Sequence, residues 1–121
     1  MANPSSDIRT SMAEVDGLLV VSLPSELSDA VMKRIVRDVT ERAAAAGIRG
    51  VILNLSTVTL LDLAEFGVLR QLVQTNDVLG VPTVLMGIRP GIAAYLCQMP
   101  ITLDDLTFRV DMASALEACD G

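Results

Sequence analysis

The sequence contains no histidine and no tryptophan, and its aromatic residues are one tyrosine and two phenylalanines. Without histidine, the Ser-His and Cys-His pairs of many hydrolases cannot form, and the most common nitrogen ligand of zinc is missing. The two cysteines, Cys97 and Cys119, form no CxxC motif. We therefore expect no disulfide framework and no metal site, and we expect both thiols to be buried or half-buried.

Long apolar runs and an excess of positive charge are also missing. No run approaches the roughly 18 residues that span a bilayer, and the polar segment from Met1 to Arg9 has no signal-peptide core. The formal net charge of −6 disfavours nucleic acid and anionic membrane surfaces as partners. The expected location is the cytoplasm, without membrane insertion.

Aliphatic residues dominate what is present. The chain has 121 residues, of which 51% are hydrophobic and only 2% aromatic, so one domain with an aliphatic core is expected over residues 1–121. Residues 1–6 are expected to form a frayed tail. The mean hydropathy of +0.52 is high for this length. It favours a sheet covered on both faces together with an apolar surface patch that a partner or a second copy covers.

The spacing of the apolar residues predicts the element order ββαβαβαβα. Strands are expected at residues 8–13, 18–23, 51–55, 83–86 and 106–110, and helices at residues 28–46, 63–79, 90–99 and 112–119. Because strands and helices alternate after the first strand, the fold class is α/β with a mostly parallel central sheet and helices outside it.

The stretch from Val51 to Arg70 contains the most informative pattern. A strand buried on both faces is followed by a polar turn, and Asp62 with Glu65 three residues later has the spacing of a helix capping box. Open α/β sheets usually bind their ligands at this carboxyl end of the strands. With no histidine and no evident cluster of carboxylates, these turn residues favour binding over catalysis.

Two alternatives for phosphate chemistry follow from the loops. The turn from Gly87 to Gly91 carries Arg89 between a strand and a helix, where an anion could bind, but it matches neither GxGxxG nor a Walker motif. A small nucleotide-binding α/β protein is thus a weaker alternative. The hydroxyls of Ser56, Thr57 and Thr59 could accept a phosphoryl group, although ordinary turn chemistry explains them better.

The order of elements, the stretch VILNLSTVTLLDLAEFGVL and the later VPTVLMGIRPGIAAYLCQM resemble the STAS domain family. More narrowly, they resemble the stressosome S-type and R-type scaffold proteins and the anti-sigma-factor antagonists. The resemblance implies a single STAS-like domain that is not an enzyme and needs no cofactor. It implies a serine kinase or anti-sigma-type switch protein and other STAS proteins as partners, in homo- or hetero-oligomers. The alternative within the family is a STAS subunit of a lipid- or anion-transport complex.

The positions that carry the family's phosphorylation switch differ in this chain. In the family, an aspartate is followed by a serine or threonine that a dedicated serine kinase phosphorylates. Asp62 matches the aspartate, but Leu63 and Ala64 stand where the hydroxyl belongs. Tyr95 stands near the place of a second phosphothreonine of the R-type proteins. The resemblance therefore implies a relative that lacks the usual phosphorylatable residue.

A contact surface is expected at the start of the second predicted helix. If Leu63 and Ala64 are exposed, they form an apolar centre with Asp62 and Glu65 at its edge, and Arg89 lies beside them across the edge of the sheet. Such a surface suits docking into a groove of a partner protein. If Leu63 faces the core instead, only the helix cap remains.

Overall fold

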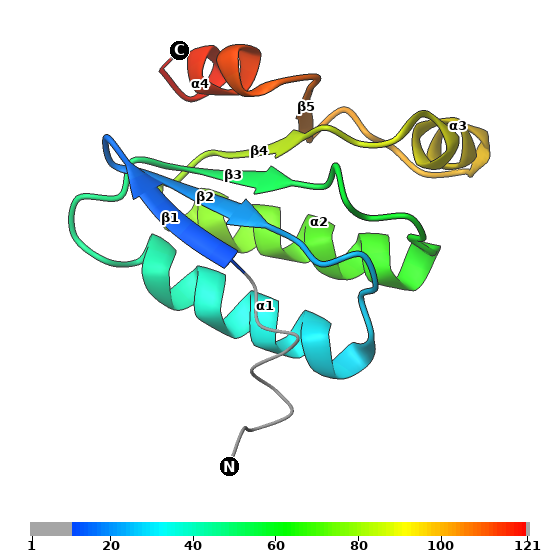
Figure 1. Ribbon diagram of the computed structural model, residues 1–121, viewed down its shortest axis with the longest axis horizontal. Helices are drawn as coiled ribbons and strands as arrows, with labels where there is room; N and C mark the ends of the chain where they lie inside the picture. The colour runs from blue at the N-terminus through cyan, green and yellow to red at the C-terminus, as the bar shows by residue number, and fades with distance from the viewer. Residues whose placement is uncertain (1–10, 121) are drawn as a thin grey trace.

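Five strands form one mixed sheet in the computed structural model, which describes residues 11–120 (Figure 1). The strands are β1 (Ser11–Val15), β2 (Leu18–Ser22), β3 (Gly50–Asn54), β4 (Thr83–Met86) and β5 (Thr107–Arg109). Their order in the sheet is β1-β2-β3-β4-β5, with β1 antiparallel to β2 and all other neighbours parallel. The predicted element order and the mostly parallel sheet are confirmed.

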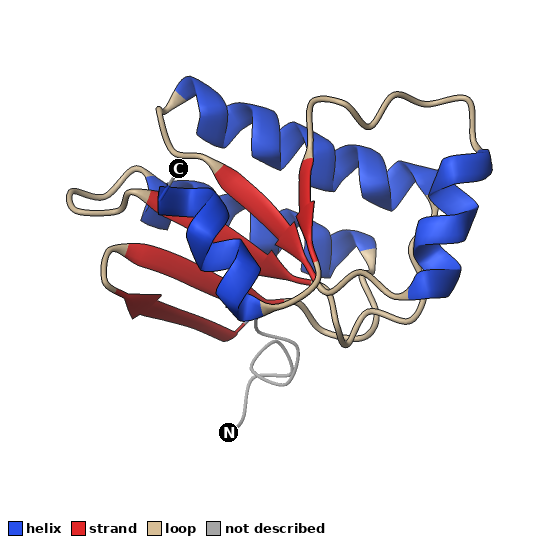
Figure 2. Ribbon diagram, turned by 90° about the horizontal axis from the view of Figure 1, so that it is seen from above, coloured by secondary structure: helices blue, strands red, loops and turns tan. Residues whose placement is uncertain are grey.

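The helices cover the two faces of the sheet unequally. They are α1 (Asp29–Ala43), α2 (Leu63–Val78), α3 (Pro90–Gln98) and α4 (Met112–Asp120). Helices α1 and α2 pack side by side on one face, α4 lies alone on the other, and α3 lies beyond the carboxyl ends of the strands (Figures 1 and 2). No helix within residues 11–120 is both long enough and apolar enough to cross a membrane.

Strand β3 shows why the sequence has a continuous apolar run. Val51 and Leu53 belong to the core cluster under α1 and α2, whereas Ile52 between them belongs to the cluster under α4. Successive side chains of a strand point to opposite faces, and all three side chains are fully buried here. The strand is therefore apolar at every position because both faces of the sheet are covered around it.

The end of α1, the exposure of Cys97 and the position of the first strand differ from the predictions. Helix α1 ends at Ala43 rather than near Ala46, because the amide of Ala45 bonds to the carbonyl of Arg42 three residues back and begins a tight turn. Cys97 is exposed, so the prediction that both thiols are at least half-buried is wrong for it; only Ile92 and Leu96 of α3 are buried. The first strand is found at 11–15, and the expected tail at residues 1–6 lies outside the described residues.

Arg70 of α2 binds the loop that precedes β5. Its guanidinium donates to both carboxylate oxygens of Asp105, at 2.6 and 3.3 Å, and lies 5.9 Å from the centre of the Phe66 ring. The hydrogen bonds from Arg70 lower the pKa of Asp105. The contact holds a long irregular segment against the second helix.

Replacing Arg70 with glutamine should lower the melting temperature by up to a few degrees at pH 7. Because the pKa of Asp105 is lowered in the folded state, the contact stabilises the fold above the unfolded pKa of about 3.9 and loses its effect as the pH falls through the folded value. The difference between variant and wild type in thermal melts should thus disappear in acid. Arg37→Gln, which removes a longer and exposed pair with Asp38, should change little at any pH. A difference that persists unchanged at low pH would contradict this account.

Candidate functional site

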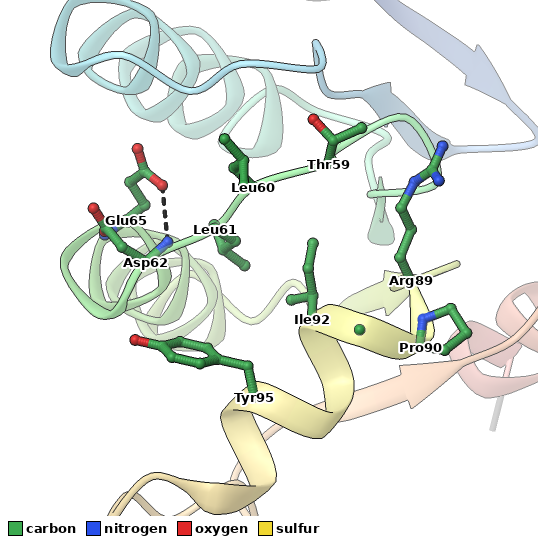
Figure 3. Close-up of a pocket in the computed structure, with 10 residues that line it drawn as sticks. Thr59, Leu60, Leu61, Asp62, Glu65, Arg89, Pro90, Ile92 and Tyr95 are labelled. Carbon is green, nitrogen blue, oxygen red and sulfur yellow. Dashed lines mark hydrogen bonds between the residues drawn. The ribbon is translucent and has the colours of Figure 1, made fainter.

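A cleft of about 750 Å³ opens between the start of α2 and the first turns of α3, at the carboxyl ends of β3 and β4 (Figure 3). One wall comes from the loop between β3 and α2 together with the first turn of α2, and the other from α3 and the residue before it. The lining residues are Thr59, Leu60, Leu61, Asp62, Glu65, Arg89, Pro90, Gly91, Ile92 and Tyr95. Both walls thus come from the connections that follow parallel strands, where α/β sheets usually bind ligands.

The acidic wall is fixed by the cap of α2. The Asp62 carboxylate accepts a hydrogen bond from the amide of Glu65 at 2.7 Å, and the Glu65 carboxylate accepts one from the amide of Asp62 at 3.0 Å. This confirms the predicted capping box, which typically stabilises a helix by about 1 kcal/mol. Each hydrogen bond uses one oxygen of one of the two carboxylates. Both negative charges are therefore held in place at the rim of the cleft.

A side-chain hydrogen bond ties the opposite wall to the loop that leads to the acidic wall. Pro90 occupies the first turn of α3, where its missing amide costs no helical hydrogen bond. Arg89 precedes it, and its Nε donates to the carbonyl oxygen of Ser56 at 3.1 Å. Gly87 has a φ of +73°, and a Cβ built on it would lie 3.3 Å from Ser56 Cβ. The positive φ and the close approach of the two loops therefore favour a glycine at this position.

The cleft is apolar at its base and partly apolar at its margin. Leu61 and Ile92 are buried and point toward each other from the two walls (Figure 3). Leu60 is 74% exposed and Tyr95 is 37% exposed, and the Tyr95 side chain extends toward the start of α2 (Figure 3). An apolar base with exposed apolar residues and a charged rim resembles the composition of a protein-binding surface, with apolar contacts at the centre and polar groups around them.

The structure brings together three of the five predicted contact residues. Asp62 and Glu65 lie on one wall of the cleft and Arg89 on the other. Leu63 and Ala64 are exposed in the first turn of α2, but they do not line the cleft. Leu63 is 38% exposed, so of the two alternatives for this side chain the structure has the exposed one.

Leu60 is the most exposed apolar residue of the cleft, and sequence reasoning missed it. It is adjacent to Leu61, and the two look equivalent in the sequence. Leu61 directly precedes the N-cap residue Asp62 and is buried, as is Phe66 in the first turn of α2. This is the spacing of a hydrophobic staple. Recognising the staple would have assigned Leu61 to the interior and left Leu60 for the surface.

The groups with displaced pKa values lie outside the cleft. Hydrogen bonds from Ser114 lower the pKa of Asp111, which caps α4, and burial raises the pKa of the Cys119 thiol. These two shifts and the shift of Asp105 all have structural causes. Within residues 11–120, no group of cysteine, aspartate and glutamate side chains is arranged to hold a metal ion.

Comparison with known proteins gives the following relationships. The family model of the STAS domain matches residues 9–113. The RsbT co-antagonist protein RsbRD of Bacillus subtilis (strain 168) is 24% identical over 105 residues, which cover 87% of this chain and 38% of that protein. This chain thus spans well under half the length of RsbRD.

Two solved structures have the same fold. The structure of a single-substitution variant of RsbS from Moorella thermoacetica has a TM-score of 0.80 and 21% identity, covering 93% of this chain and 95% of that one. A chain from a structure of the stressosome, described as a signal integration and transduction hub, has a TM-score of 0.74 and 22% identity, covering 91% and 96%.

Proposed function

This chain belongs to the STAS domain family, and from that premise we propose that it is a non-enzymatic regulatory or scaffold protein of the stressosome or anti-sigma-factor-antagonist type. It acts in the cytoplasm by binding other proteins. Its partners are a serine kinase or anti-sigma-type switch protein and other STAS proteins. The names of RsbRD, a co-antagonist of RsbT, and of the stressosome structure support this proposal.

The observation that carries the proposal is the exposed Leu60 beside a rigid acidic helix start. An apolar side chain that is 74% exposed can contribute affinity when a partner covers it. Asp62 and Glu65 are oriented by their own cap bonds, so a basic partner surface would meet charges that are already in position. Arg89 on the other wall adds one positive charge that would orient the partner.

The first turn of α2, beside the cleft, lacks the usual switch. Leu63, which follows Asp62, has no hydroxyl to phosphorylate, and Tyr95 stands near the place of the second phosphothreonine of the R-type proteins. A phosphoryl group would add about two negative charges to an already acidic rim and oppose docking. We therefore propose a binder that phosphorylation at position 63 does not release.

Purification of the tagged chain from its own cells tests this function. We expect an anti-sigma-type serine kinase and other STAS proteins to be retained, and the purified kinase to elute with the chain as one complex. Copurification with a transport ATPase or a permease would contradict the proposal and favour the transport-complex alternative. Saturable nucleotide binding that Arg89→Ala abolishes would favour the nucleotide-binding alternative instead.

A further inference from the structure

In the part of the chain that the structure describes, the outer edge of the sheet at β1 lacks the usual protection. β1 has five residues, whereas the opposite edge strand β5 has three. Within residues 11–120, no strand pairs with the outer edge of β1. Natural edge strands are usually protected by proline, lysine or a bulge. The β1 sequence SMAEV contains none of these residues, and it pairs with β2 residue for residue, without a bulge. Its one charge, Glu14, is paired with Arg42 at 2.9 Å.

The turn after β1 determines which backbone groups face this edge. β1 and β2 are joined by Asp16 and Gly17, both with positive φ, at 52° and 82°. Positive φ at both central residues is typical of a two-residue type I′ turn, which makes Val15 and Leu18 a hydrogen-bonded pair. Because bonding alternates along an antiparallel pair, every second residue of β1 bonds to β2. The amides and carbonyls of Met12 and Glu14 consequently point to the open edge.

We propose that two copies of this chain associate by pairing their β1 strands antiparallel, with the two-fold axis at Ala13. In this register Met12 lies opposite Glu14 of the second copy, so the residues whose backbone groups face the open edge meet each other. Each of the two such pairs can form two backbone hydrogen bonds. An axis at Glu14 would instead place two like charges opposite each other, which is unfavourable.

The side chains of β1 suit this register on both faces of the sheet. On the α1 face, Met12 packs against the core and Glu14 is neutralised by Arg42. On the other face, Ser11, Ala13 and Val15 are exposed and uncharged. Helix α4 contacts β3, β4 and β5 on that face and leaves β1 uncovered (Figure 2).

Charge favours a second copy at this edge. The chain carries a net charge of −6, so two copies repel each other, and the repulsion is smallest where the surfaces that meet are neutral. A two-fold interface brings the same patch of both copies together, and the neutral edge of β1 meets this requirement. The pairing would join two sheets into one and, because β1 contributes no residue to the cleft, leave both clefts open. This inference thus adds a second surface to the proposed function.

The mass of the full chain in solution tests the association. We expect the wild type to sediment with the mass of two copies at micromolar concentration, and Ala13→Lys, which places two lysines on the axis, to sediment as one copy. Val78→Lys, a matched change of an 87% exposed residue at the end of α2, should behave as the wild type. A larger assembly that Ala13→Lys disrupts also supports the proposal. A wild-type monomer, or an assembly that Ala13→Lys leaves intact, overturns it.

Disulfide formation tests the register in a variant without native thiols (Cys97→Ser, Cys119→Ser). With the axis at Ala13, the two Ala13 Cα atoms would be about 4.5 Å apart, within the range for a disulfide. The two Val15 residues would be displaced by about 13 Å along the strands. Oxidation should therefore link the two copies of Ala13→Cys covalently and leave the two copies of Val15→Cys without a covalent link. Equal linkage of both variants, or linkage of Val15→Cys alone, contradicts the register.

Discussion

Leu63→Ser is expected to turn a chain that takes up no phosphate at position 63 into a substrate of its partner serine kinase. The position is accessible, because Leu63 is 38% exposed in the first turn of α2. The positive end of the helix dipole favours a negative group there. Intact-mass measurement after incubation with kinase and ATP should show one added phosphoryl group on the variant and none at this position on the wild type.

Two comparisons make this result interpretable. Leu63→Ala removes the same apolar side chain without adding a hydroxyl, so it should gain nothing and shows whether the serine itself is the acceptor. The kinase must also modify one of its own STAS substrates in the same experiment. If Leu63→Ser remains unmodified while that substrate is phosphorylated, the correspondence between Leu63 and the family's phosphorylation site is wrong.

Leu60→Gln should weaken binding of the kinase or other partner about tenfold or more, the effect expected for an apolar residue at the centre of an interface. The glutamine leaves the charge of the rim unchanged and adds an amide that the partner must desolvate. Because Leu60 is 74% exposed, the melting temperature should change little. Calorimetric titration measures the affinity, and thermal melting measures the stability.

Val78→Gln is the matched control for Leu60→Gln, since Val78 is 87% exposed at the far end of α2; it should bind as the wild type. Leu63→Gln separates the cleft from the outer side of the first turn. Should Leu63→Gln weaken binding while Leu60→Gln does not, the partner docks outside the cleft, and the assignment of the cleft as the binding surface is contradicted.

The sheet and the order of its elements could be predicted because the periodicity of apolar residues is a local signal. It reflects the type of each element and requires little knowledge of long-range contacts. β3 is apolar throughout since both faces of the sheet are covered, and this is visible in the sequence. The capping box at Asp62 and Glu65 is likewise local. The exposure of Cys97 was not predictable in this way. Its helix has only nine residues, and which side faces the core is decided by where the loops place it.

The cleft was predictable in part. Asp62 and Arg89 follow neighbouring parallel strands, and this topology alone brings their loops together at one end of the sheet. The role of Leu60 required distinguishing two adjacent leucines by the staple geometry. Recognising the open edge at β1 required the turn conformation at Asp16 and Gly17. This conformation determines the direction of each backbone group of β1, and the pattern of apolar residues does not reveal it.

The most direct test adds ATP to the purified complex of the wild-type chain with its serine kinase and measures the bound fraction by size-exclusion chromatography. We predict that the wild type stays bound and unmodified at position 63, whereas the Leu63→Ser complex dissociates as phosphate is added beside Asp62 and Glu65. The contradicting result is that ATP releases the wild-type chain and that a residue of the cleft carries a phosphoryl group. The docking surface would then have a phosphorylation switch after all.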